Sequence, residues 1–210
     1  MTILALEFSS DQRSVAVADN GTVLSEATET GGRGVAAFGM IERVLDGAKL
    51  EREQIQAISV GLGPGSYTGI RAAIALAEGW RLARDISVTG VSSVETIVSV
   101  AQSQEINGPI SVVVNAQREE FYCATYDITE TSWTEITPLK IVSRDEVLSL
   151  SQGRLIIGPE APKFPDGRLI FPSAAAVATL AAQRNNFRPT EQLEPIYLRE
   201  TTFVKVKPKT

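Results

Sequence analysis

The residues Gly63-Pro64-Gly65-Ser66-Tyr67-Thr68-Gly69-Ile70-Arg71 form a glycine-rich loop that follows an apolar run and opens a helical pattern continuing to Arg84. This order predicts a strand that turns through glycines into a helix. Such a turn leaves backbone N–H groups and the positive end of a helix dipole free for an anionic group. Gly63 and Gly65 permit positive φ and close approach, and Ser66 and Thr68 are able to cap the helix. The loop is not a Walker P-loop, since no Gly-Lys-Ser/Thr follows it. A tight turn that binds nothing is the alternative interpretation.

Composition narrows the classes of protein that the chain can represent. Its 210 residues are 43% hydrophobic, enough for one large or two small domains with real cores. No apolar stretch approaches the length of a membrane span and no secretory pattern opens the chain, so we expect a cytoplasmic protein without membrane contact. Cys123 is the only cysteine, which suits a reducing compartment. The net charge of −5 makes the chain a poor binder of nucleic acid, and any contact with tRNA is expected to be indirect.

Histidine is absent from the sequence, and this excludes several kinds of catalytic site. A Ser-His-Asp triad, a Cys-His pair, a histidine-containing zinc site and a histidine general base are all impossible within this chain. Any catalysis would have to rely on carboxylates, on lysine or on a metal bound by carboxylates.

The order of predicted elements repeats once along the chain. The first set comprises strands at 2–8, 14–18 and 22–27, a helix at 35–48, a strand at 55–60, a helix at 68–84, a strand at 87–91 and a helix at 94–104. The second set comprises strands at 110–115, 120–126 and 134–142, a helix at 144–150, a strand at 155–157 and a helix at 173–184. In the second set, Gly158-Pro159 stands where the glycine-rich loop stands in the first.

Two such units predict an α/β protein with a duplicated actin-like fold, in which two mixed sheets are flanked by helices and the second half is abbreviated. We expect an N-terminal domain at 1–104, which carries the glycine loop and the interface helices, and a shortened C-terminal domain with a tail at 105–210. In this architecture the first hairpin of each half, here 7–10 and 115–118, faces a shared cleft that holds nucleotide phosphates. The candidate phosphate contacts are Glu7, Ser9, Gly63, Gly65, Ser66, Thr68 and Arg71.

Two predicted helices carry a second face in addition to the face that covers a sheet. In the helix at 68–84, Ala72, Ala75 and Gly79 form a stripe of small residues away from the core face. In the helix at 35–48, the residues placed off the core face are Ala36, Gly39, Met40, Arg43 and Gly47. We interpret these residues as a surface on which the paired helices meet another protein. The alternative is that the stripes serve only the packing of the two helices on each other.

The glycine-rich loop is part of a longer motif. Gly-x-Gly-Pro-Gly-Ser-Phe/Tyr-Thr-Gly-Leu/Ile-Arg is the signature of the TsaB (YeaZ) family, which is related to TsaD and the M22 glycoprotease-like group, and residues 61–71 resemble this signature. Residues 3–9 resemble the family's opening strand, residues 115–122 its Asp-Ala-Arg-Arg-x-Glu-Val-Tyr segment, and residues 195–199 its Pro-x-Tyr-Leu-Arg segment. The resemblance extends over nearly the whole chain.

The resemblance implies a noncatalytic scaffold in the synthesis of threonylcarbamoyladenosine, the modification beside the anticodon of tRNAs that read codons starting with A. Family members pair with TsaD, which binds the metal and transfers the threonylcarbamoyl group, while TsaE joins through TsaD and a separate synthase makes the donor. The two helices correspond to the family's dimerisation surface, so a homodimer is also possible. No catalytic residue, no metal and no cofactor is expected on this chain alone, although ADP or ATP at the interface with TsaD is conceivable.

The sequence departs from the family pattern at three places. Glu7-Phe8 stands for Asp-Thr, residues 35–37 stand for His-Ser-Glu, and Asn115 and Gln117 replace an acid and a base. These changes weaken the case for nucleotide hydrolysis, because kinases of this fold need carboxylates at both hairpins to hold Mg²⁺. An ATP-dependent phosphotransferase therefore remains the second hypothesis, with Glu7 as its only evident hairpin carboxylate, and an M22-type protease is the third.

Three further segments of the sequence have structural interpretations. Arg118, Glu119, Glu120 and Tyr122 either line the cleft between the halves or form a solvated strand edge. Residues 197–199 are expected to dock on the body of the protein. The lysines at 205, 207 and 209 are read as part of a solvated tail.

Overall fold

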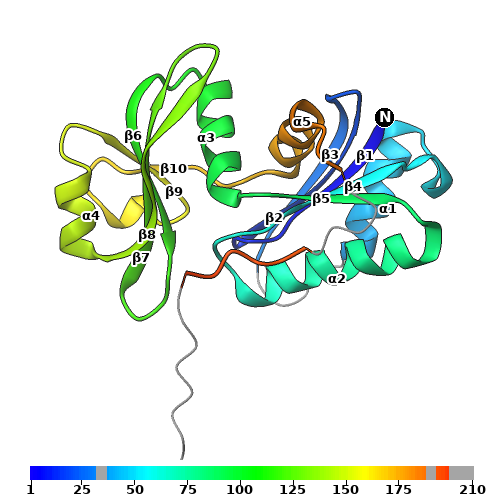
Figure 1. Ribbon diagram of the computed structural model, residues 1–210, viewed down its shortest axis with the longest axis horizontal. Coiled ribbons are helices and arrows are strands. Elements are labelled where there is room, and N and C mark those ends of the chain that lie inside the picture. Colours follow the sequence, from blue (N-terminus) through cyan, green and yellow to red (C-terminus); the bar gives the residue numbers. More distant parts are fainter. Residues whose placement is uncertain (32–36, 188–192, 199–210) are drawn as a thin grey trace, which may run out of the picture.

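The computed structural model describes residues 1–31, 37–187 and 193–198 (Figure 1). Its first half contains β1 (Thr2–Glu7), β2 (Gln12–Asp19), β3 (Thr22–Thr30), α1 (Ala37–Ala48), η1 (Arg52–Gln54), β4 (Ala57–Gly61), α2 (Tyr67–Arg84), β5 (Ser87–Val91) and α3 (Ser93–Ser103). Its second half contains β6 (Gly108–Asn115), β7 (Glu120–Ile128), β8 (Trp133–Ser143), α4 (Arg144–Leu150), β9 (Leu155–Gly158), η2 (Ala161–Lys163), β10 (Arg168–Leu169) and α5 (Ala174–Arg184).

The two halves have the same sheet topology. The first sheet has the order β3-β2-β1-β4-β5, and the second, read from its far edge, has the order β8-β7-β6-β9-β10. In the first sheet β1 pairs antiparallel with β2 and parallel with β4, and in the second β6 pairs antiparallel with β7 and parallel with β9. The strand that opens each half thus lies at the centre of its sheet. This identity of order confirms the duplication expected from the sequence.

The second half is abbreviated after its glycine turn. The long helix α2 follows β4, but its counterpart after β9 is only the three-residue η2. The edge strand β10 is likewise reduced to Arg168–Leu169, which pairs with Ile157 and Gly158 of β9. The sequence pattern does not predict η1, η2 or β10, because each is too short to establish a period.

Side-chain alternation along β1 and β2 gives the first sheet two different faces. Leu4, Leu6, Val15 and Val17 are buried in the cluster under α1 and α2. Ala5, Ala16 and Ala18 point to the opposite face, where they pack with the alanine-rich α5. Small residues on both sides allow this helix to lie close to the sheet.

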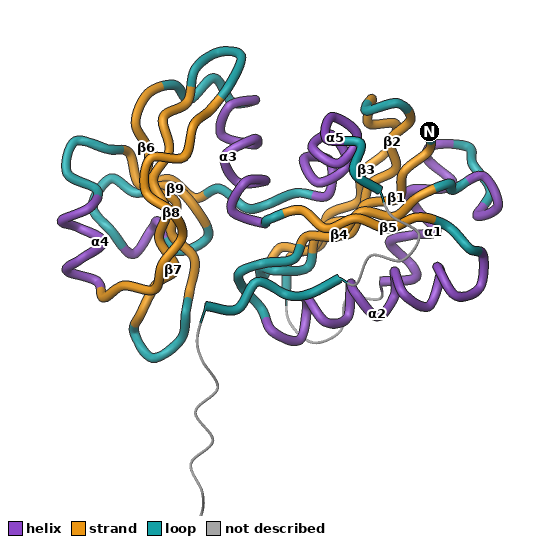
Figure 2. Tube along the Cα trace, viewed as in Figure 1, coloured by secondary structure: helices purple, strands orange, loops and turns teal. Residues whose placement is uncertain are grey.

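Each half supplies one helix to the other half. The buried face of α3, which includes Ile97 and Ala101, packs in the core of the second sheet, although α3 follows β5 of the first. Helix α5 comes after the second sheet and packs on the first, as Figure 2 shows. The guanidinium of Arg184 on α5 donates to both carboxylate oxygens of Glu95 on α3, at 3.1 and 2.6 Å. The expected boundary between 104 and 105 therefore separates the two sheets but not the two cores.

No helix in the described residues is both long and apolar enough to span a bilayer.

Candidate functional site

The glycine loop is docked against the turn between β1 and β2. Gly63 and Gly65 have φ of +86° and +152°, as the glycine pattern predicts. Ser66 is the N-cap of α2, and its Oγ accepts a hydrogen bond from the Gly69 N–H at 3.3 Å. Its own N–H donates to the Ser9 carbonyl oxygen at 2.6 Å. The predicted capping by Ser66 is confirmed, whereas Thr68 lies within the first turn of α2 and is exposed.

Two glycines of the motif are required by this docking alone. A Cβ at position 65 would lie 2.1 Å from the carbonyl oxygen of Ser9, and a Cβ at position 69 would lie 2.0 Å from that of Phe8. Both obstacles are backbone atoms, which have no freedom to rotate away. The motif therefore has a structural reason to contain glycine at these positions, whether or not a ligand binds.

Glu7 lies beneath the loop and not in front of it. Its side chain is fully buried, with Oε1 accepting from the Ser9 N–H and Oε2 accepting from Ser93 Oγ, both at 2.8 Å. Ser93 Oγ in turn accepts from the Gly63 N–H at 3.0 Å. Burial raises the pKa of the Glu7 carboxyl above its usual value, and these hydrogen bonds oppose the shift. The structure thus corrects the expectation that Glu7 faces a phosphate, because its carboxylate holds the loop from below.

A cleft of about 330 Å³ lies between the two halves, at the place that the actin-like fold predicts. Four of the candidate residues line it, namely Ser9, Gly65, Ser66 and Thr68, whereas Glu7, Gly63 and Arg71 do not. Asn115 and Gln117 of the second hairpin lie on the opposite wall.

The cleft also exposes two carboxylates that the sequence analysis missed. Asp11 comes from the turn after β1, and Glu160 comes from the second glycine turn. The position of Glu160 directly after Gly158-Pro159 was the available signal, since that turn is the counterpart of the glycine loop. Among the described residues that line the cleft there is no lysine or arginine. The described lining therefore offers a polyphosphate hydroxyls and backbone, and Lys163, which lies outside the lining, forms an ion pair with Glu160.

A second concave surface lies between α1 and α2, which cover the same face of the first sheet side by side (Figure 1). We call it the helix groove; it has a volume of about 450 Å³ and a largely apolar lining. Its lining residues are Phe38, Ile41, Arg52, Glu53, Ala75, Leu76, Gly79, Trp80, Ala83 and Arg84. Phe38 of this lining is 66% exposed, and Leu82, also on α2, is 80% exposed. Exposed apolar side chains beside an apolar groove are typical of protein interaction surfaces.

The small-residue stripe of α2 faces outward as predicted. Ala72, Ala75 and Gly79 are all exposed, and a Cβ on Gly79 would find nothing within 4 Å. The small size of residue 79 is therefore not needed for packing of α2 on the described part of the chain. This observation argues against the interpretation that the stripe serves only contact between α1 and α2.

The predicted stripe of α1 has to be corrected. Met40 is fully buried in the first core, so it does not belong to an outer face. Gly47 lies against Ser25 of β3, and Arg43 forms an ion pair with Glu29 of the same strand. Gly39 is half-buried and does not line the helix groove, and Ala36 lies outside the described residues. The α1 residues that do line the helix groove are Phe38 and Ile41. The signal for Phe38 was an exposed phenylalanine in an amphipathic helix.

The C-terminal segment docks on the body, as predicted for Tyr197. Leu193 is buried in the first core, and the Ile196 N–H donates to the Leu62 carbonyl oxygen at 2.9 Å. The ring of Tyr197 stacks on Tyr67 with centroids 5.4 Å apart. Arg71, one turn further along α2, donates to Tyr67 Oη at 2.7 Å; Tyr67 lines the cleft, whereas Arg71 does not. Arg199 lies outside the described residues.

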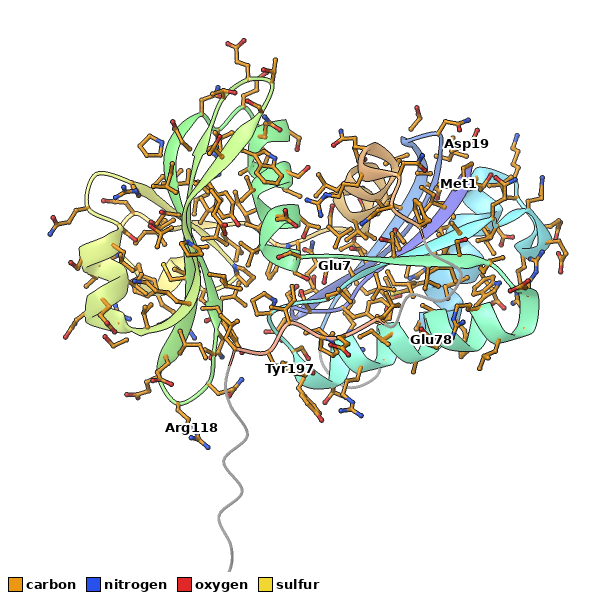
Figure 3. All side chains as sticks on the ribbon, viewed as in Figure 1. Met1, Glu7, Asp19, Glu78, Arg118 and Tyr197 are labelled. Atoms are coloured by element: carbon orange, nitrogen blue, oxygen red, sulfur yellow. The ribbon has the colours of Figure 1, made fainter. Side chains whose placement is uncertain are left out.

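The turn of the second hairpin projects into solvent. Arg118 and Glu119 are exposed, with φ of +55° and +62°, and Figure 3 shows Arg118 at the tip of the turn. Tyr122 is buried in the second core. Of the polar cluster predicted here, none of the four members lines the cleft between the halves.

Reactive groups are scarce in the described part of the chain. No set of three or more cysteine, aspartate or glutamate residues there is grouped closely enough to hold a metal ion. The thiol of Cys123 is buried, and burial raises its pKa from 9.0 to about 11. A thiol with such a pKa is a poor nucleophile at neutral pH, because its thiolate is the reactive form.

Comparison with known proteins agrees with this architecture. A family model described as TsaD, tRNA N6-adenosine threonylcarbamoyltransferase, matches residues 35–187. The tRNA threonylcarbamoyladenosine biosynthesis protein TsaB of Escherichia coli K12 is 26% identical over 234 residues, covering 99% of both chains. An uncharacterized protein of Mycobacterium tuberculosis H37Rv is 31% identical over 153 residues, covering 72% of this chain and 68% of its own. The structure of YeaZ from Pseudomonas aeruginosa superimposes with a TM-score of 0.80 at 23% identity, covering 94% and 99% of the two chains.

The duplicated mixed sheets and the cleft between them define a protein of the actin-like class. Within that class, the chain belongs to the TsaB (YeaZ) family, which shares a domain with TsaD.

Proposed function

We propose that this chain acts in tRNA threonylcarbamoyladenosine biosynthesis as a noncatalytic subunit that docks on TsaD through the helix groove. The relatives named TsaB support the pathway. The observation that carries the docking role is the groove itself, an open apolar surface in which residue 79 is a glycine with free space above it. A mid-helix glycine costs about 0.8–1.0 kcal/mol relative to alanine, and close approach by a second chain gives a reason for keeping it.

The chemistry of the described residues supports a role without catalysis. The absence of histidine, the buried Cys123 and the buried Glu7 leave Asp11, Glu160 and Tyr67 as the ionisable groups among the described residues that line the cleft. TsaD supplies the transfer reaction in this proposal, and TsaE joins through TsaD. The chain binds no cofactor alone, and ADP or ATP at the interface with TsaD stays a prediction.

The proposal is tested by reconstitution of the modification reaction from TsaD, TsaE, the donor-forming synthase and this chain. Leaving out the chain is expected to abolish threonylcarbamoyladenosine in the tRNA. Full product in its absence would defeat the proposal.

A pair of variants then tests the surface. Gly79→Glu places a charge in the helix groove and is expected to abolish the complex with TsaD, measured by sedimentation, while the isolated chain stays folded. Ser149→Glu adds the same charge to an exposed position on α4 of the other half and is expected to bind like the wild type. Equal binding by both variants would show that the groove is not the docking surface.

A further inference from the structure

The helix groove has a third wall that belongs to neither α1 nor α2. The short η1 helix contributes Arg52 and Glu53 to the lining. None of the three residues of η1 is buried, although Leu50 and Ile55 on either side of it pack in the first core. The exposed turn between these two anchors depends on polar contacts with neighbouring elements for its position.

Arg84, in the last turn of α2, makes such contacts. Its Nη1 donates to the carbonyl oxygen of Arg52, and its Nη2 donates to the carbonyl oxygen of Glu53 at 2.8 Å. The planar guanidinium thus spans two successive carbonyls, a geometry that the single ammonium group of lysine does not reproduce. On the other side, Arg52 donates to Glu42 of α1 at 2.8 Å, but both side chains are more than half exposed, and pairs of this kind contribute little. Arg84 is the stronger tie between η1 and the helix pair.

We propose that Arg84 is a positioning residue for the docking of TsaD, because it fixes the η1 wall and so gives the helix groove its binding shape before the partner arrives. A surface that is already ordered does not have to lose conformational freedom on association, and this raises affinity. The inference rests on the function proposed above. TsaD is the expected occupant because the TsaD family model matches this chain from residue 35, through α1 and α2. A TsaD chain therefore carries a corresponding helix pair that can be set against this one.

Amide hydrogen exchange of the isolated chain separates positioning from direct contact. The Gln54 and Ile55 N–H groups donate within η1, to the carbonyls of Glu51 and Arg52, and report whether the turn is closed. Arg84→Ala is expected to speed exchange of these two amides in the absence of any partner, and to weaken TsaD binding by about tenfold, roughly the effect of one charge-assisted hydrogen bond. Arg84→Lys keeps the charge and is expected to be intermediate in both measurements.

Arg81→Ala is the matched control, since it removes the same charge from the same helix. Arg81 pairs with Glu78 and does not line the helix groove. It is expected to leave both the exchange of the η1 amides and the affinity for TsaD unchanged. Unchanged exchange in Arg84→Ala would overturn the inference, as would faster exchange with wild-type affinity. Failure of the wild-type chain itself to bind TsaD would instead refute the proposed function, and this inference with it.

Discussion

Gly79→Ala is expected to stabilise the isolated chain while it weakens the complex. Position 79 lies in the interior of α2, where glycine costs about 0.8–1.0 kcal/mol relative to alanine. The new Cβ would have nothing within 4 Å, so no clash offsets this gain. The free energy of unfolding should therefore rise by about 1 kcal/mol, which corresponds to a Tm higher by roughly 2–4 °C for a chain of this size.

Urea unfolding measures the effect, with an unchanged m-value as evidence that only stability has changed. Gly69→Ala is the control in the same helix, and it is expected to destabilise, because its Cβ would lie 2.0 Å from the Phe8 carbonyl oxygen. Binding to TsaD is then measured for Gly79→Ala, and a weaker complex is expected because the methyl group separates the two surfaces. If Gly79→Ala destabilised the isolated chain, residue 79 would be packed inside the molecule, and the reasoning about the helix groove would be refuted.

Three further outcomes are expected. Because burial raises the pKa of Glu7 above 4.5, the contribution of this carboxyl to stability is complete below that value and is lost as the pH rises through the folded pKa. Glu7→Gln should therefore gain stability relative to the wild type between pH 4 and pH 8, measured by urea unfolding. A stability difference that is constant with pH would contradict this. Tyr197→Ala removes the stack on Tyr67 and should cost about 0.5–1.5 kcal/mol beyond the lost buried area, whereas unchanged stability would show that the tail is not docked in solution. Titration of the isolated chain with Mg·ATP should give no binding heat, since none of the described residues that line the cleft is a lysine or arginine, and tight binding with turnover would favour a phosphotransferase.

Local patterns in the sequence were sufficient for most of the fold. Alternation along β1 and β2 and the helical period after Ser66 depend on residues close together in the chain. The strand at 87–91 and the helix at 144–150 were predicted with the bounds that the structure has. The small outer face of α2 was also predictable, because the side-chain directions of a helix follow from spacing alone.

The contents of the two surfaces were not predictable in the same way. Met40 was predicted to lie on the outer face of α1. A helical wheel gives the direction of each side chain but not the extent of the sheet beneath the helix, and β3 extends under the Met40 side of α1. Asp11 and Glu160 are 149 positions apart and face one cleft only because the two halves pack together. Non-local proximity of this kind leaves no period in the sequence.

The sequence by itself determined that this protein has duplicated α/β halves, a glycine loop capped by Ser66 and no histidine chemistry. The tertiary structure decided that α3 and α5 each cover the other half's sheet, that Glu7 lies beneath the loop, and that η1 closes the groove beside α1 and α2. The reason is physical. Backbone conformation and side-chain direction are set within a few residues, whereas burial depends on which distant segments arrive on each face, and only the folded chain brings them together.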